Sequence, residues 1–215
     1  MKKGNSKVLT AEEQSKLTPD KVIAVLKQGN EAFANNDITL KNNIERVHDA
    51  VKGQYPEAVI LSCLDSRIPV ADIFQCGIGD IFVIRIAGNI VNTDILGSME
   101  YACMVSGSKL VVVMGHGDCG AIKSAIDNVE FGNITGLLNK VKPAVNHSKV
   151  NFQGQTTSSN PEFVGFVGRT NVELTVNEIR KNSPILKAME DKGEIRIVGA
   201  MYDMKNGKIN FLENI

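Results

Sequence analysis

The chain of 215 residues lacks the features that direct a protein to a membrane or a polyanion. No apolar run approaches the ~18 residues of a membrane-spanning helix. With 24 basic and 24 acidic residues the formal net charge is zero, so no global field attracts nucleic acid or anionic lipid. The first residues have no apolar stretch of the secretory-signal type, which predicts a cytoplasmic protein, or a periplasmic one if a signal peptide has been removed. We therefore expect neither a nucleic-acid nor a membrane partner.

Cysteine is scarce as well, with four residues at positions 63, 76, 103 and 119. An even number permits two disulfides, but a chain this long with 43% hydrophobic residues builds a core without them. The length suits one domain. We predict a flexible lead over the polar residues 1–18 and a single domain over 19–215.

The hydrophobic pattern alternates between strand-like and helix-like segments. Short runs rich in branched apolar residues predict buried strands at Ala58–Ser62, Ile81–Ile86, Lys109–Met114 and Glu194–Tyr202, with Asn206-Gly207 forming a tight hairpin into Lys208–Leu212. Helical spacing starts at Thr18-Pro19 and recurs over about 40–51, 95–105, 119–129, 133–148 and 161–181. This order predicts an α/β fold with a mostly parallel central sheet flanked by helices.

Two of the predicted strands run into residues that bind metals. The first is followed by Cys63-x-Asp65-x-Arg67, and the third by His116-x-x-Cys119 within a glycine-rich turn. Sites in open α/β sheets form at the carboxyl ends of strands, so the two segments meet if these strands are neighbours. Two thiolates and an imidazole suit Zn²⁺, and three protein ligands leave a fourth position for water.

Other interpretations of these residues exist. Buried cysteines are commonly inert apolar side chains, an isolated H-x-x-C is a weak metal motif, and an isolated D-x-R is often a turn-stabilising ion pair. The two motifs together, both at strand ends, favour a metal site. A non-catalytic zinc or thiol-redox module stays open, although such a closed site has no use for Asp65 and Arg67.

The motifs resemble those of the β-class carbonic anhydrases, and the resemblance extends over most of the chain. Besides the two ligand segments, similar stretches are Gly29-Asn30-Glu-Ala-Phe33, Gly53-Gln54-x-Pro56, Arg85-x-Ala87-Gly88-Asn89, Ser98-Met-Glu100-Tyr101 and Gly199-Ala-x-Tyr202-Asp203. The resemblance implies reversible hydration of carbon dioxide to bicarbonate and a proton by zinc-bound hydroxide. A relative with the same ligands hydrolyses carbon disulfide, so carbon disulfide or carbonyl sulfide is an alternative substrate.

The resemblance also implies a role for each matching residue. Zinc would be bound by Cys63, His116 and Cys119. Asp65 would accept a hydrogen bond from the zinc-bound water, and Arg67 would hold Asp65 away from the metal. Gln54 would bind substrate, Phe82, Ala87 and Tyr101 would line an apolar pocket shared with a neighbouring subunit, and the Gly120 N–H would face the substrate oxygen.

The family builds homodimers, or dimers of dimers, in which N-terminal helices pack on a partner subunit. We expect Val22, Ile23, Leu26 and Phe33 to form that apolar face. Two positions depart from the family pattern. Ala32 replaces an arginine, and Ile60 stands where a bicarbonate-regulated subgroup has tryptophan, a residue this chain lacks. The second departure predicts a resting state in which Asp65 pairs with Arg67 and not with zinc.

Overall fold

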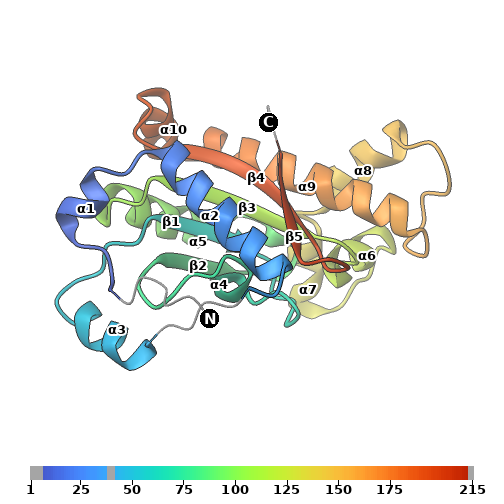
Figure 1. Cartoon of the computed structure of the whole chain (residues 1–215). Coiled ribbons are helices and arrows are strands. Elements are labelled where there is room, and N and C mark those ends of the chain that lie inside the picture. Colours follow the sequence, from blue (N-terminus) through green and yellow to red (C-terminus); the bar gives the residue numbers. More distant parts are fainter. Residues whose placement is uncertain (1–6, 38–41, 213–215) are drawn as a thin grey trace.

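A five-stranded sheet in the order β2-β1-β3-β4-β5 forms the centre of the protein (Figure 1). The structure is a computed structural model and describes residues 7–37 and 42–212. The first four strands in this order run parallel to their neighbours, and only β5 is antiparallel. The strands are β1 (Ala58–Ser62), β2 (Ile81–Arg85), β3 (Leu110–His116), β4 (Arg196–Asp203) and β5 (Lys208–Leu212). The predicted α/β fold with a mostly parallel sheet is confirmed.

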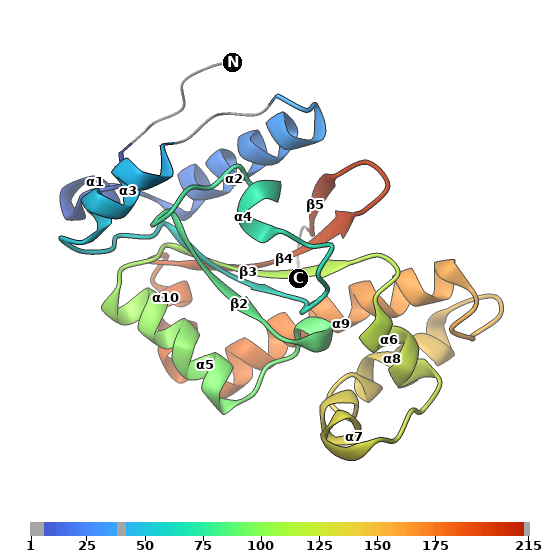
Figure 2. The same ribbon diagram turned by 90° about the horizontal axis from the view of Figure 1, so that it is seen from below.

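Helices cover both faces of the sheet (Figure 2). One face packs against α2 and α4, and the other against α5, α9 and α10, each through an apolar cluster. A third cluster, at the carboxyl ends of the strands, joins α6, α8 and α9. The helices are α1 (Ala11–Ser15), α2 (Pro19–Ala34), α3 (Asn43–Ala50), α4 (Val70–Ile73), the short turn η1 (Ala87–Asn89), α5 (Thr93–Glu100), the π-helical turn η2 (Tyr101–Val105), α6 (Gly120–Ile126), α7 (Gly132–Leu138), α8 (Lys142–Asn151), α9 (Pro161–Asn182) and α10 (Pro184–Asp191). None of the helices in the described ranges is long and apolar enough to cross a bilayer.

The structure differs from the predicted elements at three places. The helix expected over 133–148 is two helices, because Pro143 lies in the first turn of α8 and favours a helix start there. Helix α10 was not predicted, although Ser183-Pro184 is a helix-start signal of the same kind as Thr18-Pro19. The hairpin between β4 and β5 exists, but β4 ends at Asp203 and β5 begins at Lys208, so four residues and not two connect them.

The lead of residues 1–18 also differs from the prediction. Thr10 and Glu13 form a capping box that starts α1. Gln14 is buried and donates to the carbonyl oxygens of Pro56 and Ser106, at 2.8 Å each. The expectation of a flexible lead is therefore wrong for the segment around α1, while residues 1–6 lie outside the described part of the chain.

The apolar face of α2 serves the fold of its own chain. Val22 and Leu26 are fully buried in the cluster beneath α2, and Ile23 and Phe33 pack against the same cluster. Val22 and Leu26 are therefore not available to a partner subunit, whereas Ile23 and Phe33 stay partly exposed, and packing of the N-terminal helices on a partner remains a prediction. Helix α3 does have an exposed apolar face, formed by Ile44, Val47 and the following Val51.

Candidate metal centre

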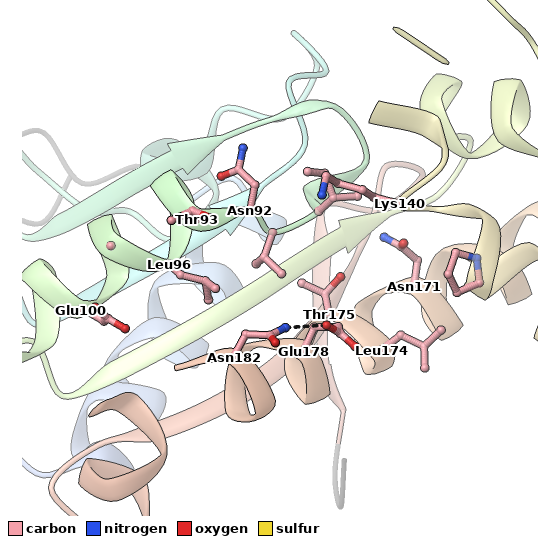
Figure 3. Close-up of a pocket in the computed structure, with 14 residues that line it drawn as sticks. Asn92, Thr93, Leu96, Glu100, Lys140, Asn171, Leu174, Thr175, Glu178 and Asn182 are labelled. Atoms are coloured by element: carbon pink, nitrogen blue, oxygen red, sulfur yellow. Dashed lines mark hydrogen bonds between the residues drawn. The ribbon is translucent and has the colours of Figure 1, made fainter. Parts of the chain in front are cut away.

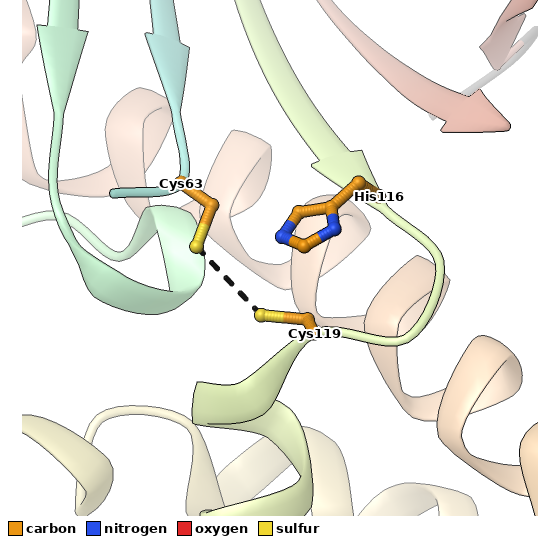
Figure 4. Close-up of side chains that lie close together, drawn as sticks. All are labelled: Cys63, His116 and Cys119. Atoms are coloured by element: carbon orange, nitrogen blue, oxygen red, sulfur yellow. Dashed lines mark hydrogen bonds between the residues drawn. The ribbon is translucent and has the colours of Figure 1, made fainter. Parts of the chain in front are cut away.

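Two neighbouring strands bring the three predicted ligands together. β1 and β3 pair in parallel, with Ser62 opposite Met114, so their carboxyl ends lie side by side. Cys63 directly follows β1, His116 is the last residue of β3, and Cys119 immediately precedes α6 (Figure 4). Since β2 lies on one side of β1 and β3 on the other, this is the point where the strand order reverses, the usual place for a site in such sheets.

The ligand atoms of these residues form a compact buried group. The Cys63 and Cys119 sulfurs and a ring nitrogen of His116 all lie within 4.8 Å of one another. The two sulfurs are 3.7 Å apart, and all four cysteines are free thiols. Cys63, His116 and Cys119 are 4%, 3% and 2% exposed. Three soft or borderline donors converging in a water-poor space have the chemistry of a zinc site.

The orientation of His116 leaves one nitrogen available for a metal. Its Nδ1 is 2.8 Å from the carbonyl oxygen of Gly117, which requires a hydrogen on Nδ1. In the neutral ring Nε2 is then unprotonated, and it is buried without a hydrogen-bond partner among the described residues. A buried acceptor without a partner is costly, so this atom fits a role as metal ligand.

The thiols favour one negative charge even before a metal binds. The hydrogen bond from Cys119 lowers the pKa of the Cys63 thiol, while the same contact and burial raise the pKa of Cys119. The Gly88 N–H also approaches the Cys63 sulfur, at 3.4 Å. The pair thus shares a proton that a divalent cation would displace.

Asp65 and Arg67 form the predicted ion pair beside this group. Arg67 donates from Nε and Nη2 to the two carboxylate oxygens, at 2.9 and 2.7 Å. Its side-chain hydrogen bonds hold the pKa of Asp65 well below the usual range, so the carboxylate stays ionised. Asp65 Oδ2 lies 4.0 Å from His116 Nε2. An ionised acceptor therefore faces the space that the ligand atoms enclose.

A further ion pair lies beside this dyad, in the turn between His116 and α6. Lys123 pairs with Asp118 across the turn, and not with Asp127 four residues ahead on α6. Asp118 has a positive φ of 54°, and its side chain lies toward both Lys123 and Arg67. Asp118 does not cap α6 either, since Cys119 occupies the N-cap position without a side-chain hydrogen bond.

The predicted substrate residues fall into two groups. Ala87 is the first residue of η1, next to the Gly88 N–H at Cys63, and Gly120 is exposed with open space where a side chain would be. Gln54 precedes β1, so the length of that strand separates it from Cys63. Phe82 and Tyr101 share a pocket of about 620 Å³ that none of the three ligands lines. Within one chain, this second group does not reach the candidate metal centre.

A cavity of about 710 Å³ lies between α5 and α9 (Figure 3). Its lining includes Glu100, which lies in one of the family-like sequence stretches, and Lys140, Asn171 and Glu178, which no sequence motif indicated. Asn171 donates to the Gly88 carbonyl oxygen at 2.8 Å, which links this cavity to the backbone beside Cys63.

Known proteins share both the sequence and the fold. Residues 58–209 match the family model described as carbonic anhydrase. Carbonic anhydrase 2 of Mycobacterium tuberculosis is 32% identical over 196 residues (88% of this chain and 91% of the relative), and the carbonic anhydrase of Mycolicibacterium smegmatis is 31% identical with the same coverage. A tetrameric β-carbonic anhydrase of Sordaria macrospora superimposes with a TM-score of 0.69 at 27% identity, over 90% of this chain and 98% of that one. The chain therefore belongs to the β-class carbonic anhydrase family.

Proposed function

We propose that this protein reversibly hydrates carbon dioxide to bicarbonate and a proton at a Zn²⁺ held by Cys63, His116 and Cys119. The observation that carries the proposal is the buried, unpartnered Nε2 of His116 beside two thiols and an ionised carboxylate. Membership of the carbonic anhydrase family supports the same reaction. The Asp65–Arg67 pair, whose arginine is half exposed, argues against a closed structural site, where such a pair would have no substrate to face.

Bound zinc supplies the acidity that makes hydroxide available near neutral pH. The chain's own groups orient the reaction. Asp65 Oδ2, 4.0 Å from His116 Nε2, accepts a hydrogen bond from the attacking water and directs its lone pair toward the carbon of the substrate. Arg67 donates to both oxygens of Asp65, which keeps the carboxylate from becoming a metal ligand itself. The exposed Gly120 leaves room for a small uncharged substrate.

A zinc analysis combined with stopped-flow carbon dioxide hydration tests this function. The wild-type protein should hold one zinc per chain and hydrate carbon dioxide, and Cys119→Ser should lose both. Cys76→Ser is the matched control, because Cys76 is a free cysteine outside the candidate centre. Wild-type protein without zinc, or full activity in Cys119→Ser, would contradict the proposal.

We also propose that a second copy completes the substrate pocket, because three expected substrate residues lie far from the metal centre of their own chain. β2 is an edge strand, and Val83 on it is exposed. Phe82 pairs with Val59 and Arg85 with Ser62, so about 10 Å of strand separates Phe82 from the metal-bearing end. A partner's β2 running antiparallel along this edge would bring its Phe82 toward that end.

Mixed dimers test the shared pocket. Asp65→Asn damages the metal side of a site, and Tyr101→Ala damages the apolar side. If each site draws on both chains, a heterodimer of the two variants contains one site with both sides intact, and its activity should return to about half that of the wild type. If each site belongs to one chain, the heterodimer stays no more active than the mean of the two homodimers. A protein that is monomeric by sedimentation and active at assay concentrations would also refute the shared pocket.

A further inference from the structure

We infer that Arg85 is a positioning residue that clamps the loop carrying Cys63 and Asp65. Arg85 is the last residue of β2, opposite Ser62 in the register, so its side chain reaches the loop that follows β1. Its Nε donates to the Cys63 carbonyl oxygen at 3.1 Å, and Nη2 donates to those of Leu64 at 3.0 Å and Asp65. One guanidinium thus binds three consecutive carbonyl groups. This role rests on the proposed zinc site.

The guanidinium of Arg85 is directed at these three carbonyl oxygens. Within the described ranges, no carboxylate lies at ion-pair distance from Arg85, in contrast to Arg67, which pairs with Asp65. Hydrogen bonds from a charged donor are stronger than those between neutral groups. Arg85 is exposed, but its hydrogen bonds to three backbone oxygens fix the peptide planes of the loop. An exposed ion pair between two flexible side chains does not fix the backbone in this way.

Because a peptide group is planar, fixing a carbonyl oxygen also fixes the N–H group on the opposite side of the same peptide. When the Leu64 carbonyl oxygen points at Arg85, the N–H of the same peptide, which belongs to Asp65, points away from Arg85. The backbone N–H groups of Asp65 and Gly88 approach the Cys63 sulfur, at 3.4 Å for Gly88. The clamp therefore orients the Cys63 ligand together with one of its hydrogen-bond donors, the Asp65 N–H.

Asp65 is held by two arginines at two different atoms. Arg85 binds its backbone oxygen and Arg67 binds its carboxylate. Arg67 alone would fix the carboxylate relative to a loop that is itself free to shift. With both contacts, Arg85 at the end of the edge strand β2 fixes the loop, and Arg67 fixes the carboxylate relative to that loop. Together they set the distance between the Asp65 carboxylate and His116 Nε2.

The guanidinium shape matters for this clamp as much as its charge. Arg85 spreads its donors over Nε and Nη2, whereas a lysine has a single ammonium nitrogen that cannot reach all three oxygens at once. Arg85→Lys should therefore restore only part of the function that Arg85→Met loses. If Arg85 acted only through its positive charge, the lysine variant would behave as wild type.

The test measures how fast zinc leaves the loaded enzyme when a chromogenic chelator is added in excess. Losing the hydrogen bonds that orient a metal ligand typically costs 10- to 100-fold in affinity. We expect Arg85→Met to release zinc about tenfold faster than wild type and Arg85→Lys to be intermediate. Arg169→Met is the matched control and should stay within twofold, because Arg169 is an exposed arginine whose hydrogen bond and ion pair go to Glu173 in α9, away from the metal centre. The cobalt-substituted Arg85→Met protein should also show a changed visible absorption spectrum.

Release within twofold of wild type in Arg85→Met, or wild-type behaviour in Arg85→Lys, would overturn the clamp. If Arg85→Met does not fold, Arg85→Lys decides alone, with severalfold faster release supporting the clamp and an unchanged rate refuting it. A wild-type protein that binds no zinc would instead refute the proposed function. The two failures are therefore distinguishable.

Discussion

The substitution Asp65→Asn probes the ionised acceptor that faces the ligand group. It preserves the size of the side chain but replaces one carboxylate oxygen by an amide NH₂. Asp65 accepts from three donors of Arg67, namely Nε, Nη2 and the backbone N–H, at 2.9, 2.7 and 3.0 Å. An amide oxygen can still satisfy the donors at Oδ1. The NH₂ group then meets Nη2, donor against donor, at the oxygen that lies nearest to His116.

The size of the effect follows from which oxygen is lost. Oδ2 is the atom placed to accept a hydrogen bond from the attacking water, and removing one preoriented group of this kind costs about 10²–10³ in rate. We expect kcat/KM for carbon dioxide hydration to fall by about a hundredfold at unchanged zinc content, because the three ligands are untouched. Stopped-flow spectrophotometry with a pH indicator measures the rate, and metal analysis of the same sample measures the zinc.

The control for this experiment is Asp127→Asn, an exposed carboxylate at the end of α6 outside the dyad. It should hydrate carbon dioxide at the wild-type rate. A fall of less than threefold in Asp65→Asn with zinc retained would refute the assigned role of the carboxylate. Loss of zinc in that variant would show that Asp65 acts on the metal site as a whole.

Three further outcomes are expected. Gly29→Ala should lower the free energy of unfolding, measured in urea, by about 1–3 kcal/mol, because the added Cβ would lie 2.0 Å from the Phe74 carbonyl oxygen. Gly165→Ala in α9 should raise it by about 0.5–1 kcal/mol, because the added Cβ would meet no atom of a neighbouring element within 4 Å. The pKa of Asp65 is lowered in the folded protein, so the ionised carboxylate stabilises the fold fully above its unfolded-state pKa near 4 and progressively less as the pH falls below that value. The difference in urea midpoint between wild type and Asp65→Asn should therefore narrow from pH 5 to pH 3. Stripping zinc with a chelator should lower the melting temperature, and readdition of zinc should restore it, since ligands that bind only the folded state stabilise it; an unchanged melting temperature would count against a metal bound at the buried ligands.

The metal ligands were predictable because local chemistry and topology agree. A buried apolar run that ends in a ligand-type residue identifies both the strand and its functional end, and this holds for Cys63 and His116. The turn between His116 and Cys119 is short, so their proximity needs no long-range information. The pairing of Asp65 with Arg67 is equally local, two residues apart.

Contacts that depend on tertiary placement were not predictable from the sequence. Lys123 has a carboxylate at the ideal helical spacing in Asp127, yet the positive φ of Asp118 brings another carboxylate closer. The apolar face of α2 has the same pattern whether it covers its own sheet or a partner's, and only the packing distinguishes the two. Arg85 belongs to a recognisable sequence motif, but that motif does not indicate its three carbonyl contacts. These contacts arise from the register of β2 against β1.

The burial of β1 and β3 has a consequence for local unfolding. Every residue of both strands is buried, and both lie between other strands, so their amides exchange with solvent only when the whole sheet opens. Helix α3 and the edge strand β5 are more exposed and should exchange through smaller, more frequent openings. The three ligands therefore lie in, or within three residues of, the slowest-exchanging strands, and α3 and β5 can open transiently while the ligand-bearing strands stay in register.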